Sequence, residues 1–151
     1  MAWSYKIYTE LNFAVQKYFG EIALVELYEV VQAYIEEPEF SKIHYLLIDG
    51  SEFCAGFEPE EVLRFAKYLN LIKERDNHKT VVVIVTTPRE VACAEIFKWL
   101  KGKSKRDYCL TFEKAYALLG LPISYEEFMG KVDDLSFFND KNNDYEFRRS
   151  G

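Results

Sequence analysis

Cysteine and histidine are scarce in this chain, and neither forms a pattern that holds a metal or a disulfide. The three cysteines, Cys54, Cys93 and Cys109, are an odd number without CxxC spacing, and only two histidines occur. We expect the cysteines to be small buried hydrophobic residues, and we predict no metal site. A redox role stays an alternative for Cys54 alone, because it lies in a predicted loop after the central strand.

The chain also lacks an excess of basic residues and a long apolar run. Its formal net charge is -6, whereas a protein that binds nucleic acid through phosphates needs a basic face. No run approaches the roughly 18 apolar residues of a membrane-spanning helix, and residues 1–10 lack the layout of a signal peptide. We therefore expect a cytoplasmic protein that binds no nucleic acid and does not insert into a membrane.

Common active-site motifs are absent as well. The sequence holds no GxSxG, HExxH or GxGxxG, and Gly102-Lys103-Ser104 is no phosphate-binding loop because Phe97 stands where the earlier glycine is needed. The acidic clusters at residues 58–61 and 126–127 are typical of helix starts. The sequence therefore predicts a non-enzymatic protein without a cofactor.

Apolar and aromatic residues are abundant. Hydrophobic residues make up 49% and aromatic residues 17% of the 151 residues, which is enough for one globular domain with a sizeable core. The Phe and Tyr side chains either fill that core or line a pocket for an apolar small molecule. Composition leaves both alternatives open.

The first part of the chain predicts a hairpin, a helix and a central strand. Alternating polar and apolar residues over Tyr5–Leu11 and Phe13–Phe19 predict two paired strands. Apolar residues at helical spacing predict a helix over 21–36. The nearly continuous apolar run Ile43–Ile48 predicts a buried strand, and a loop is expected from Asp49 to Phe57.

The second part predicts further helices and strands in alternation. They are a helix from Pro59, a strand over Thr80–Thr86, a helix from Pro88 to about Lys101, a strand over Tyr108–Leu110, and helices capped by Thr111 and Ser124. The inner side of the helix from Pro59 is expected to carry Val62, Leu63, Phe65, Ala66, Leu69 and Ile72. The inner side of the helix from Pro88 is expected to carry Val91, Ala92, Ile96, Trp99 and Leu100.

One dense basic run stands out in the acidic chain. It consists of Lys98, Lys101, Lys103, Lys105 and Arg106. Cations suit the C-terminal end of a helix, so we expect these side chains to be solvated there. A patch that binds an acidic partner is the alternative.

Several segments, taken in order, resemble the SpoIIAA-like group of the STAS superfamily over residues 5–121. They are Phe19-Gly20-Glu21, Pro38-Glu39-Phe40, Tyr45-Leu46-Leu47-Ile48-Asp49, Val81–Val85, Thr111-Phe112-Glu113-Lys114-Ala115 and Leu118-Leu119-Gly120. The resemblance implies an α/β domain at 1–121 with an N-terminal β-hairpin, a mixed sheet of about five strands and helices packed mainly on one side. Residues 122–151 are then a C-terminal extension, a short helix and a polar tail, and not a separate domain.

The resemblance also implies a non-enzymatic regulatory or protein-interaction domain. In the best understood members, a phosphorylated Ser or Thr at the start of the helix after the central strand changes binding to a kinase-like regulator. Residues 53–78 of this chain contain neither Ser nor Thr, and glutamates give a fixed negative charge there instead. The nearest hydroxyl is that of Ser51, for which we expect a local turn role, with phosphorylation as the alternative.

We therefore predict that a protein partner binds the segment between Asp49 and Glu61. The predicted contact residues are Asp49, Ser51, Phe53, Phe57, Glu58, Glu60 and Glu61. Two alternatives stay open: a homodimer formed through the C-terminal extension, and a lipid-like apolar ligand in place of a protein partner. A related β/α architecture serves the lipid-carrying CRAL-TRIO domains, but fold analogy alone does not choose between these functions.

Overall fold

The computed structural model describes residues 3–72, 79–99 and 105–134. The strands are β1 (Trp3–Tyr8), β2 (Phe13–Ile22), β3 (Tyr45–Ala55), β4 (Thr80–Ile84) and β5 (Lys105–Cys109). The helices are α1 (Leu24–Glu36), α2 (Pro59–Ile72), α3 (Pro88–Trp99), α4 (Phe112–Leu119) and α5 (Tyr125–Val132). The predicted α/β class and the N-terminal hairpin are confirmed, but Thr9–Leu11, predicted in the first strand, forms a 3-10 turn. The strand predicted over Tyr108–Leu110 begins earlier and ends at Cys109.

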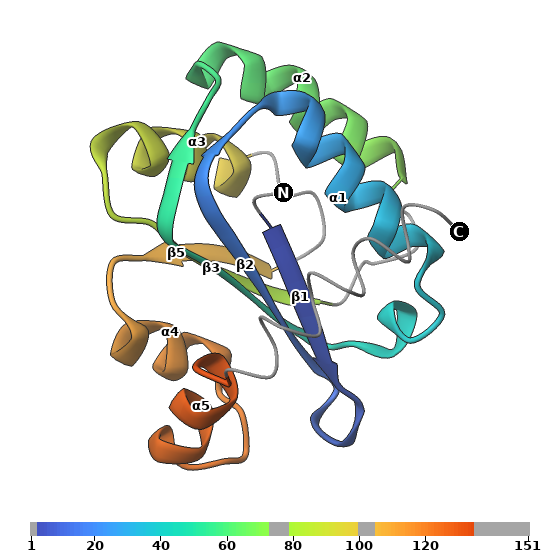
Figure 1. Cartoon of the computed structure of the whole chain (residues 1–151), viewed down its shortest axis with the longest axis vertical. Coiled ribbons are helices and arrows are strands. Elements are labelled where there is room, and N and C mark those ends of the chain that lie inside the picture. The colour runs from blue at the N-terminus through green and yellow to red at the C-terminus, as the bar shows by residue number, and fades with distance from the viewer. Residues whose placement is uncertain (1–2, 73–78, 100–104, 135–151) are drawn as a thin grey trace.

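The strands form one mixed sheet in the order β1-β2-β3-β4-β5. β1 is antiparallel to β2, and every later pair is parallel. Connections between neighbouring parallel strands are almost always right-handed, so three in succession place their helices on the same face of the sheet. Figure 1 shows α1, α2 and α3 on one side and α4 and α5 on the other. Helices were predicted mainly on one side; three lie there and two cover the opposite face.

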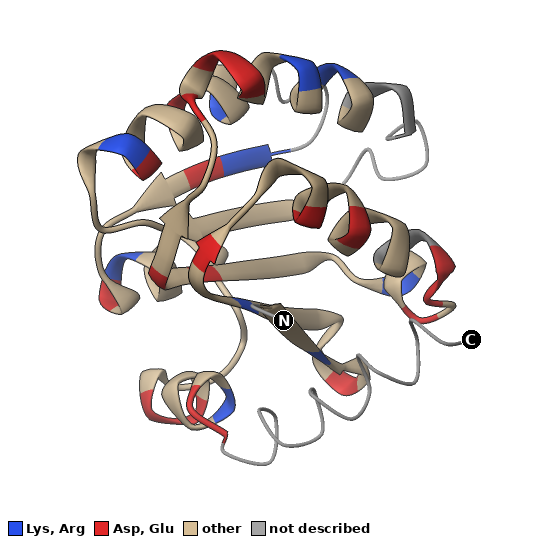
Figure 2. Cartoon of the chain, turned by 45° about the horizontal axis from the view of Figure 1, so that its top comes forward, with Lys and Arg blue, Asp and Glu red and all other residues tan. Residues whose placement is uncertain are grey.

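The two faces of the sheet bury separate cores. Alternate residues such as Val15, Leu47 and Val82 point toward α4 and α5, where they pack around the fully buried Phe128. The opposite face packs against the first three helices, with Phe65 of α2 in its cluster. The strands in the middle of the molecule carry few charges (Figure 2).

β3 is longer than the sequence predicts. It continues past Asp49 to Ala55 because β2 also continues to Ile22, and the two strands stay paired beyond a register shift between Lys17 and Phe19. The prediction of a loop from Asp49 is therefore wrong. Gly50 marks a close approach and not a turn, since a Cβ atom there would lie 2.5 Å from the carbonyl oxygen of Ile84.

The buried faces of α2 and α3 differ in part from the predicted ones. Leu63 is 45% exposed and Trp99 is 79% exposed, so neither lies on an inner face. The Trp99 indole instead donates a hydrogen bond to the Glu95 carboxylate (2.9 Å). Leu100 lies outside the described residues, as do the side chain of Ile72 and residues 139–151 of the predicted tail.

The start of the predicted C-terminal extension is part of the fold. The hydroxyls of Thr111 and Ser124 accept hydrogen bonds from the backbone N–H groups of Lys114 and Glu127, which confirms both predicted helix caps. α5 packs against the sheet, and its Val132 is fully buried beside Phe128.

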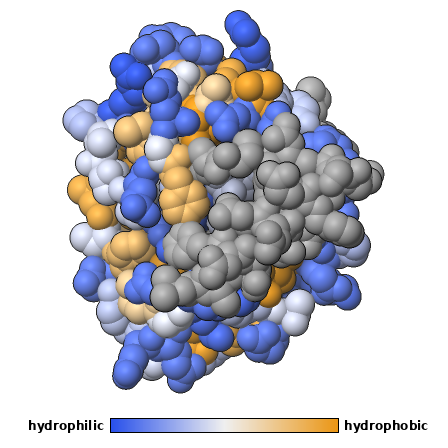
Figure 3. All heavy atoms as spheres, viewed as in Figure 1, coloured by the Kyte–Doolittle hydropathy of each residue, from blue (hydrophilic) through white to orange (hydrophobic). Residues whose placement is uncertain are grey.

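The described part of the chain contains no helix that is both long and apolar enough to cross a membrane. The face shown in Figure 3 mixes hydrophobic and hydrophilic residues. Four large apolar side chains of the described residues are well exposed: Val25, Leu63, Trp99 and Leu110. They come from different elements, and isolated apolar residues of this kind are normal on a protein surface.

Candidate ligand-binding cavity

A cavity of about 160 Å³ lies between the sheet and helices α1, α2 and α3. The sheet contributes Gln16, Tyr18, Leu46, Ile48, Gly50, Phe53, Val81, Val83 and Arg106. The helices contribute Leu27, Val30, Val31, Phe65, Leu69, Glu90, Cys93, Ala94 and Phe97, and connecting segments add Phe40, Phe57, Lys79 and Val85. Protein interiors hold few voids larger than a water molecule, so a void of this size requires an explanation.

Small side chains on α3 help to leave this space open. Glu90, Cys93, Ala94 and Phe97 follow the i, i+3, i+4, i+7 spacing of one helical face, and all four line the cavity. Cys93 and Ala94 are short, and Val81 and Val83 of β4, which also line the cavity, are short as well. Apart from Glu90, this part of the wall is therefore apolar and does not fill the space in front of it.

Gln16 and Tyr18 place a hydrogen-bonded pair in the cavity wall. The Tyr18 hydroxyl donates to Oε1 of Gln16 (3.2 Å). Burial raises the pKa of Tyr18 well above its ordinary value, and the positive charge of Arg106 opposes that shift. Gln16 is 0% exposed, and among the described residues its Nε2 group has no hydrogen-bond partner. A buried donor without a partner costs about 1 to 3 kcal/mol.

Glu90 places a carboxylate in the same cavity wall. It is 3% exposed, and its Oε1 accepts a hydrogen bond from the backbone N–H of Ala55 (3.0 Å). Its Oε2 has no partner among the described residues. The carboxylate belongs to the first turn of α3, where the helix dipole favours negative charge. Burial, followed by the charge of Glu90, raises the pKa of the Cys93 thiol to about 11.

Two cations also line the cavity, each against an aromatic ring. The Lys79 ammonium lies 4.5 Å from the ring centroid of Phe40, and the Arg106 guanidinium lies 5.4 Å from that of Phe97. Lys79 is buried. Among the described residues of the lining, the charged side chains are therefore Lys79, Arg106 and Glu90.

The structure separates the seven predicted contact residues into two groups. Glu58, Glu60 and Glu61 are exposed at the start of α2. Asp49, Ser51, Phe53 and Phe57 are buried or half-buried, and the two phenylalanines among them line the cavity. The predicted surface is therefore not continuous.

Asp49 and Ser51 interact with each other inside the sheet. The backbone N–H and the hydroxyl of Ser51 both donate to Oδ1 of Asp49, at 3.0 and 2.7 Å. The Asp49 Oδ2 atom lies 3.6 Å from the Lys17 ammonium nitrogen. Ser51 was predicted in a turn, but it is a residue of β3. Its hydroxyl is half-buried and bonded to a carboxylate.

The glutamates at the start of α2 have individual roles. The Glu61 side chain accepts a hydrogen bond from the backbone N–H of Glu58 (3.1 Å), which satisfies a donor at the helix start. The Glu58 carboxylate lies 3.6 Å from the Arg89 guanidinium, with both groups exposed. Glu60 is exposed in the first turn of the same helix.

The basic run does not behave as one solvated patch. Lys98 lies 3.1 Å from Asp107 at the surface, and Lys105 is exposed on β5. Arg106 turns to the other side of the strand and enters the cavity lining. Lys101 and Lys103 lie outside the described residues.

The polar cavity residues were not predicted as site residues. A signal exists for Glu90, which shares one helical stripe with Cys93, Ala94 and Phe97. Polar residues at positions where the pattern demands apolar ones are candidates for function. Gln16, Lys79 and Arg106 carry no comparable signal in the sequence.

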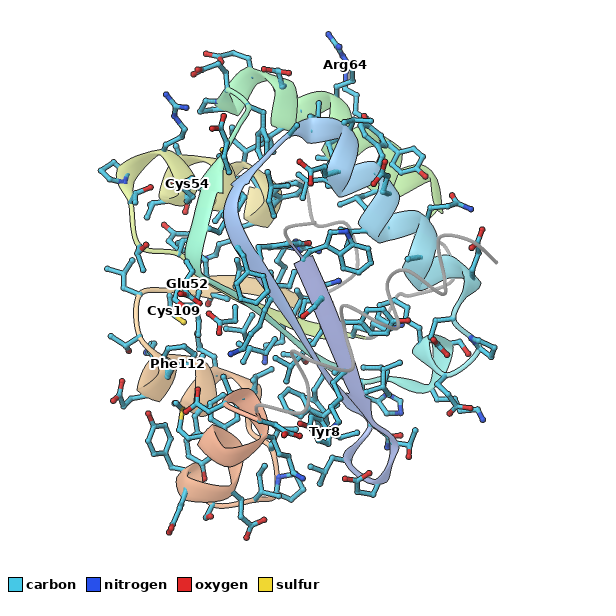
Figure 4. All side chains as sticks on the ribbon, viewed as in Figure 1. Tyr8, Glu52, Cys54, Arg64, Cys109 and Phe112 are labelled. Carbon is cyan, nitrogen blue, oxygen red and sulfur yellow. The ribbon has the colours of Figure 1, made fainter. Side chains whose placement is uncertain are left out.

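All three cysteines are free thiols. Cys93 and Cys109 are buried, as predicted, whereas Cys54 is exposed. Figure 4 shows Cys54 beside the helices at the end of β3, while Cys109 lies toward α4 and Phe112. No group of three or more potential metal ligands occurs among the residues that the structure describes.

No protein-family model matches the chain. A search of curated proteins finds no significant match either.

Proposed function

We propose that this chain is a non-enzymatic SpoIIAA-like domain that binds a small, mainly apolar molecule between the sheet and helices α1 to α3. The cavity of about 160 Å³ is the observation that carries the proposal. Benzene fills an engineered apolar cavity of about 150 Å³, so the enclosed part of the ligand is about one aromatic ring in size.

The architecture supports the SpoIIAA-like part of the proposal. The chain combines an N-terminal hairpin, a mixed five-stranded sheet and three successive helices on one face. The sequence resemblance implies the hairpin and the mixed sheet, and it implies helices mainly on one side, whereas α4 and α5 cover the opposite face. Fold alone does not specify a ligand, and the binding proposal therefore depends on the cavity and not on the resemblance.

Native mass spectrometry of the full chain, purified gently from its own host, tests the binding proposal. We expect a species heavier than the 17.8 kDa chain by the mass of one small molecule, which denaturation releases for identification. The matched control is Ala94→Leu, because a larger side chain at this position of the lining occupies the space. Bare chain alone, together with no binding of added benzene, would contradict the proposal.

A second candidate function is the binding of a protein partner at the start of α2. Glu58, Glu60 and Glu61 are all exposed there, which favours a cationic partner surface. We expect Glu58→Lys/Glu60→Lys to lose a partner that wild type retains in a cross-linked pull-down. Glu61 is left unchanged because it caps the helix. Equal recovery by wild type and variant would contradict this placement; Glu113→Lys/Glu126→Lys is the control at two other helix starts.

A further inference from the structure

The Glu90 carboxylate in the cavity wall is held in place by the end of β3. Its Oε1 atom accepts a hydrogen bond from the backbone N–H of Ala55, the last residue of that strand (3.0 Å). The guanidinium of Arg89, the residue before Glu90, donates to the carbonyl oxygen of Ala55 (3.4 Å). Both polar backbone groups of Ala55 are therefore bonded to the first turn of α3, which fixes the carboxylate relative to the sheet.

The second oxygen of this carboxylate, Oε2, is a buried hydrogen-bond acceptor. Glu90 is 3% exposed, and Oε2 has no hydrogen-bond partner among the described residues. Cys93 and Ala94 on the same stripe of α3, and Phe57 just beyond β3, also line the cavity and are hydrophobic. Water is a poor partner in such surroundings, because a buried water needs roughly two to four polar contacts. An apolar molecule that carries one hydrogen-bond donor suits Oε2 better.

Gln16 presents the opposite chemistry at a different position in the cavity. Its Nε2 group is a buried donor without a partner among the described residues. Gln16 pairs with Ile48 of β3, whereas Glu90 is bonded to Ala55, further along the same strand. A ligand oxygen that donates a hydrogen bond would therefore bind at Glu90, and one that only accepts would bind at Gln16.

We propose that the ligand is a mainly apolar alcohol or phenol whose hydroxyl donates a hydrogen bond to Oε2 of Glu90. This inference rests on the proposed function of the cavity. A carboxylate at this position would repel Glu90, and an ammonium group would bring three donors to one unpartnered side-chain acceptor. Lys79 and Arg106 each contact an aromatic ring and have further interactions within the chain, so their charges give no reason to expect an anionic ligand.

Calorimetric titration of the full chain with two pairs of ligands of similar size tests the inference. Phenol differs from toluene in a hydroxyl, which donates and accepts, and anisole differs from ethylbenzene in an ether oxygen, which only accepts. We expect phenol to bind at least about tenfold more tightly than toluene, because a hydrogen bond to a charged group strengthens binding by that much. Anisole should gain no such advantage over ethylbenzene.

The outcomes of this titration separate the inference from the function on which it rests. An advantage for anisole as large as that for phenol would show that the oxygen accepts a hydrogen bond, as from Gln16, and would overturn the inference. If toluene binds and phenol binds no more tightly, the hydroxyl inference fails and the apolar-ligand function stands. If none of the four molecules binds, both fail.

Variants assign the effect to Glu90. Glu90→Gln keeps the side-chain size and an oxygen for the Ala55 N–H, but it replaces Oε2 by a donor, so the advantage of phenol over toluene should disappear while toluene affinity stays the same. Gln16→Leu is the control, because it removes the unpartnered donor and should leave the advantage of phenol unchanged. The inference is overturned if Gln16→Leu alone removes that advantage, or if Glu90→Gln weakens phenol and toluene equally. The wild-type titration decides the question if a variant does not fold.

Discussion

Lys17 and Asp49 form an ion pair inside the sheet, with side chains 8% and 5% exposed and a nitrogen-to-oxygen distance of 3.6 Å. Asp49 also accepts two hydrogen bonds from Ser51. Replacing the carboxylate removes its attraction for the buried ammonium and leaves the Ser51 donors without this acceptor. We expect Asp49→Ala to lower the free energy of unfolding by about 3 kcal/mol or more, measured by urea denaturation.

An exposed ion pair provides the control for this prediction. Lys42 and Glu39 lie 3.7 Å apart with side chains 69% and 43% exposed. Solvent screens such a pair, so Glu39→Ala should change stability by less than about 1 kcal/mol. A similarly small loss for Asp49→Ala would mean that the buried pair does not stabilise the fold, and Asp49 would then be free to serve another role.

The cysteines should differ sharply in reactivity. The thiolate is the reactive form, and burial with the nearby Glu90 raises the pKa of Cys93 to about 11. Cys93 is therefore almost wholly protonated at pH 8 and gains reactivity only as pH rises toward 11. With iodoacetamide at pH 8, peptide mass spectrometry should find Cys54, which is exposed, labelled long before Cys93.

Unfolding supplies the control for the labelling experiment. In concentrated urea the two thiols should react at similar rates, because the burial that separates them is lost. Equal labelling of Cys93 and Cys54 in the folded protein would show that α3 opens readily or that the cavity admits the reagent. Cys54→Ser then isolates the reaction of the buried thiols.

Among the helices and strands, the sequence predicts best those whose hydrophobic pattern agrees with the burial of their residues in the fold. The hairpin, α1 and the two capped helices could be predicted because hydrophobic periodicity, turn residues and cap residues all act over a few neighbouring positions. β3 was predicted too short, because Asp49-Gly50 looks like a turn and the pairing that extends the strand involves Glu52 to Ala55 and residues 19–22 of β2. Strand ends depend on partners that are distant in the chain.

The candidate site was predicted less well than the fold, for a related reason. A sequence pattern assigns polar residues to the surface, whereas Gln16 belongs to a strand with helices on both faces and Glu90 to the inner face of α3. Trp99 was placed inside because it is large and apolar, yet it lies on the other side of the helix from Phe97. Burial of polar groups is decided by the assembly of elements, which local pattern does not report.

The contribution of α5 to stability can be measured directly. Phe128 is fully buried and packs against Phe13 of β2 and Tyr116 of α4, with ring centroids 6.2 and 5.4 Å away. We expect Phe128→Ala to cost about 3 to 5 kcal/mol by urea denaturation, because it removes contacts with two elements and leaves a cavity. Glu126→Ala, on the exposed side of the same helix, should change stability by less than about 0.5 kcal/mol. Similar small effects for both would mean that α5 is not held against the sheet in solution.

Across the whole molecule, the two faces of the sheet are packed differently. The face under α4 and α5 is filled by large rings such as Phe13 and Phe128, both 0% exposed. The face under α1 to α3 keeps a cavity of about 160 Å³ and several buried polar groups. Sites that bind ligands commonly sacrifice stability in this way, so filling the cavity should make the protein more stable and less able to bind.

Ala94→Leu tests this trade-off because Ala94 lines the cavity and is 7% exposed. A leucine adds three carbon atoms to the empty space, so we expect the free energy of unfolding to rise by about 1 kcal/mol and benzene binding to be lost. Ala66→Leu is the matched control: Ala66 is 2% exposed on α2 but is not part of the cavity lining. Overpacking there should destabilise the protein by about 1 to 3 kcal/mol. If both leucines destabilise the protein equally, the space in front of Ala94 is not empty in solution.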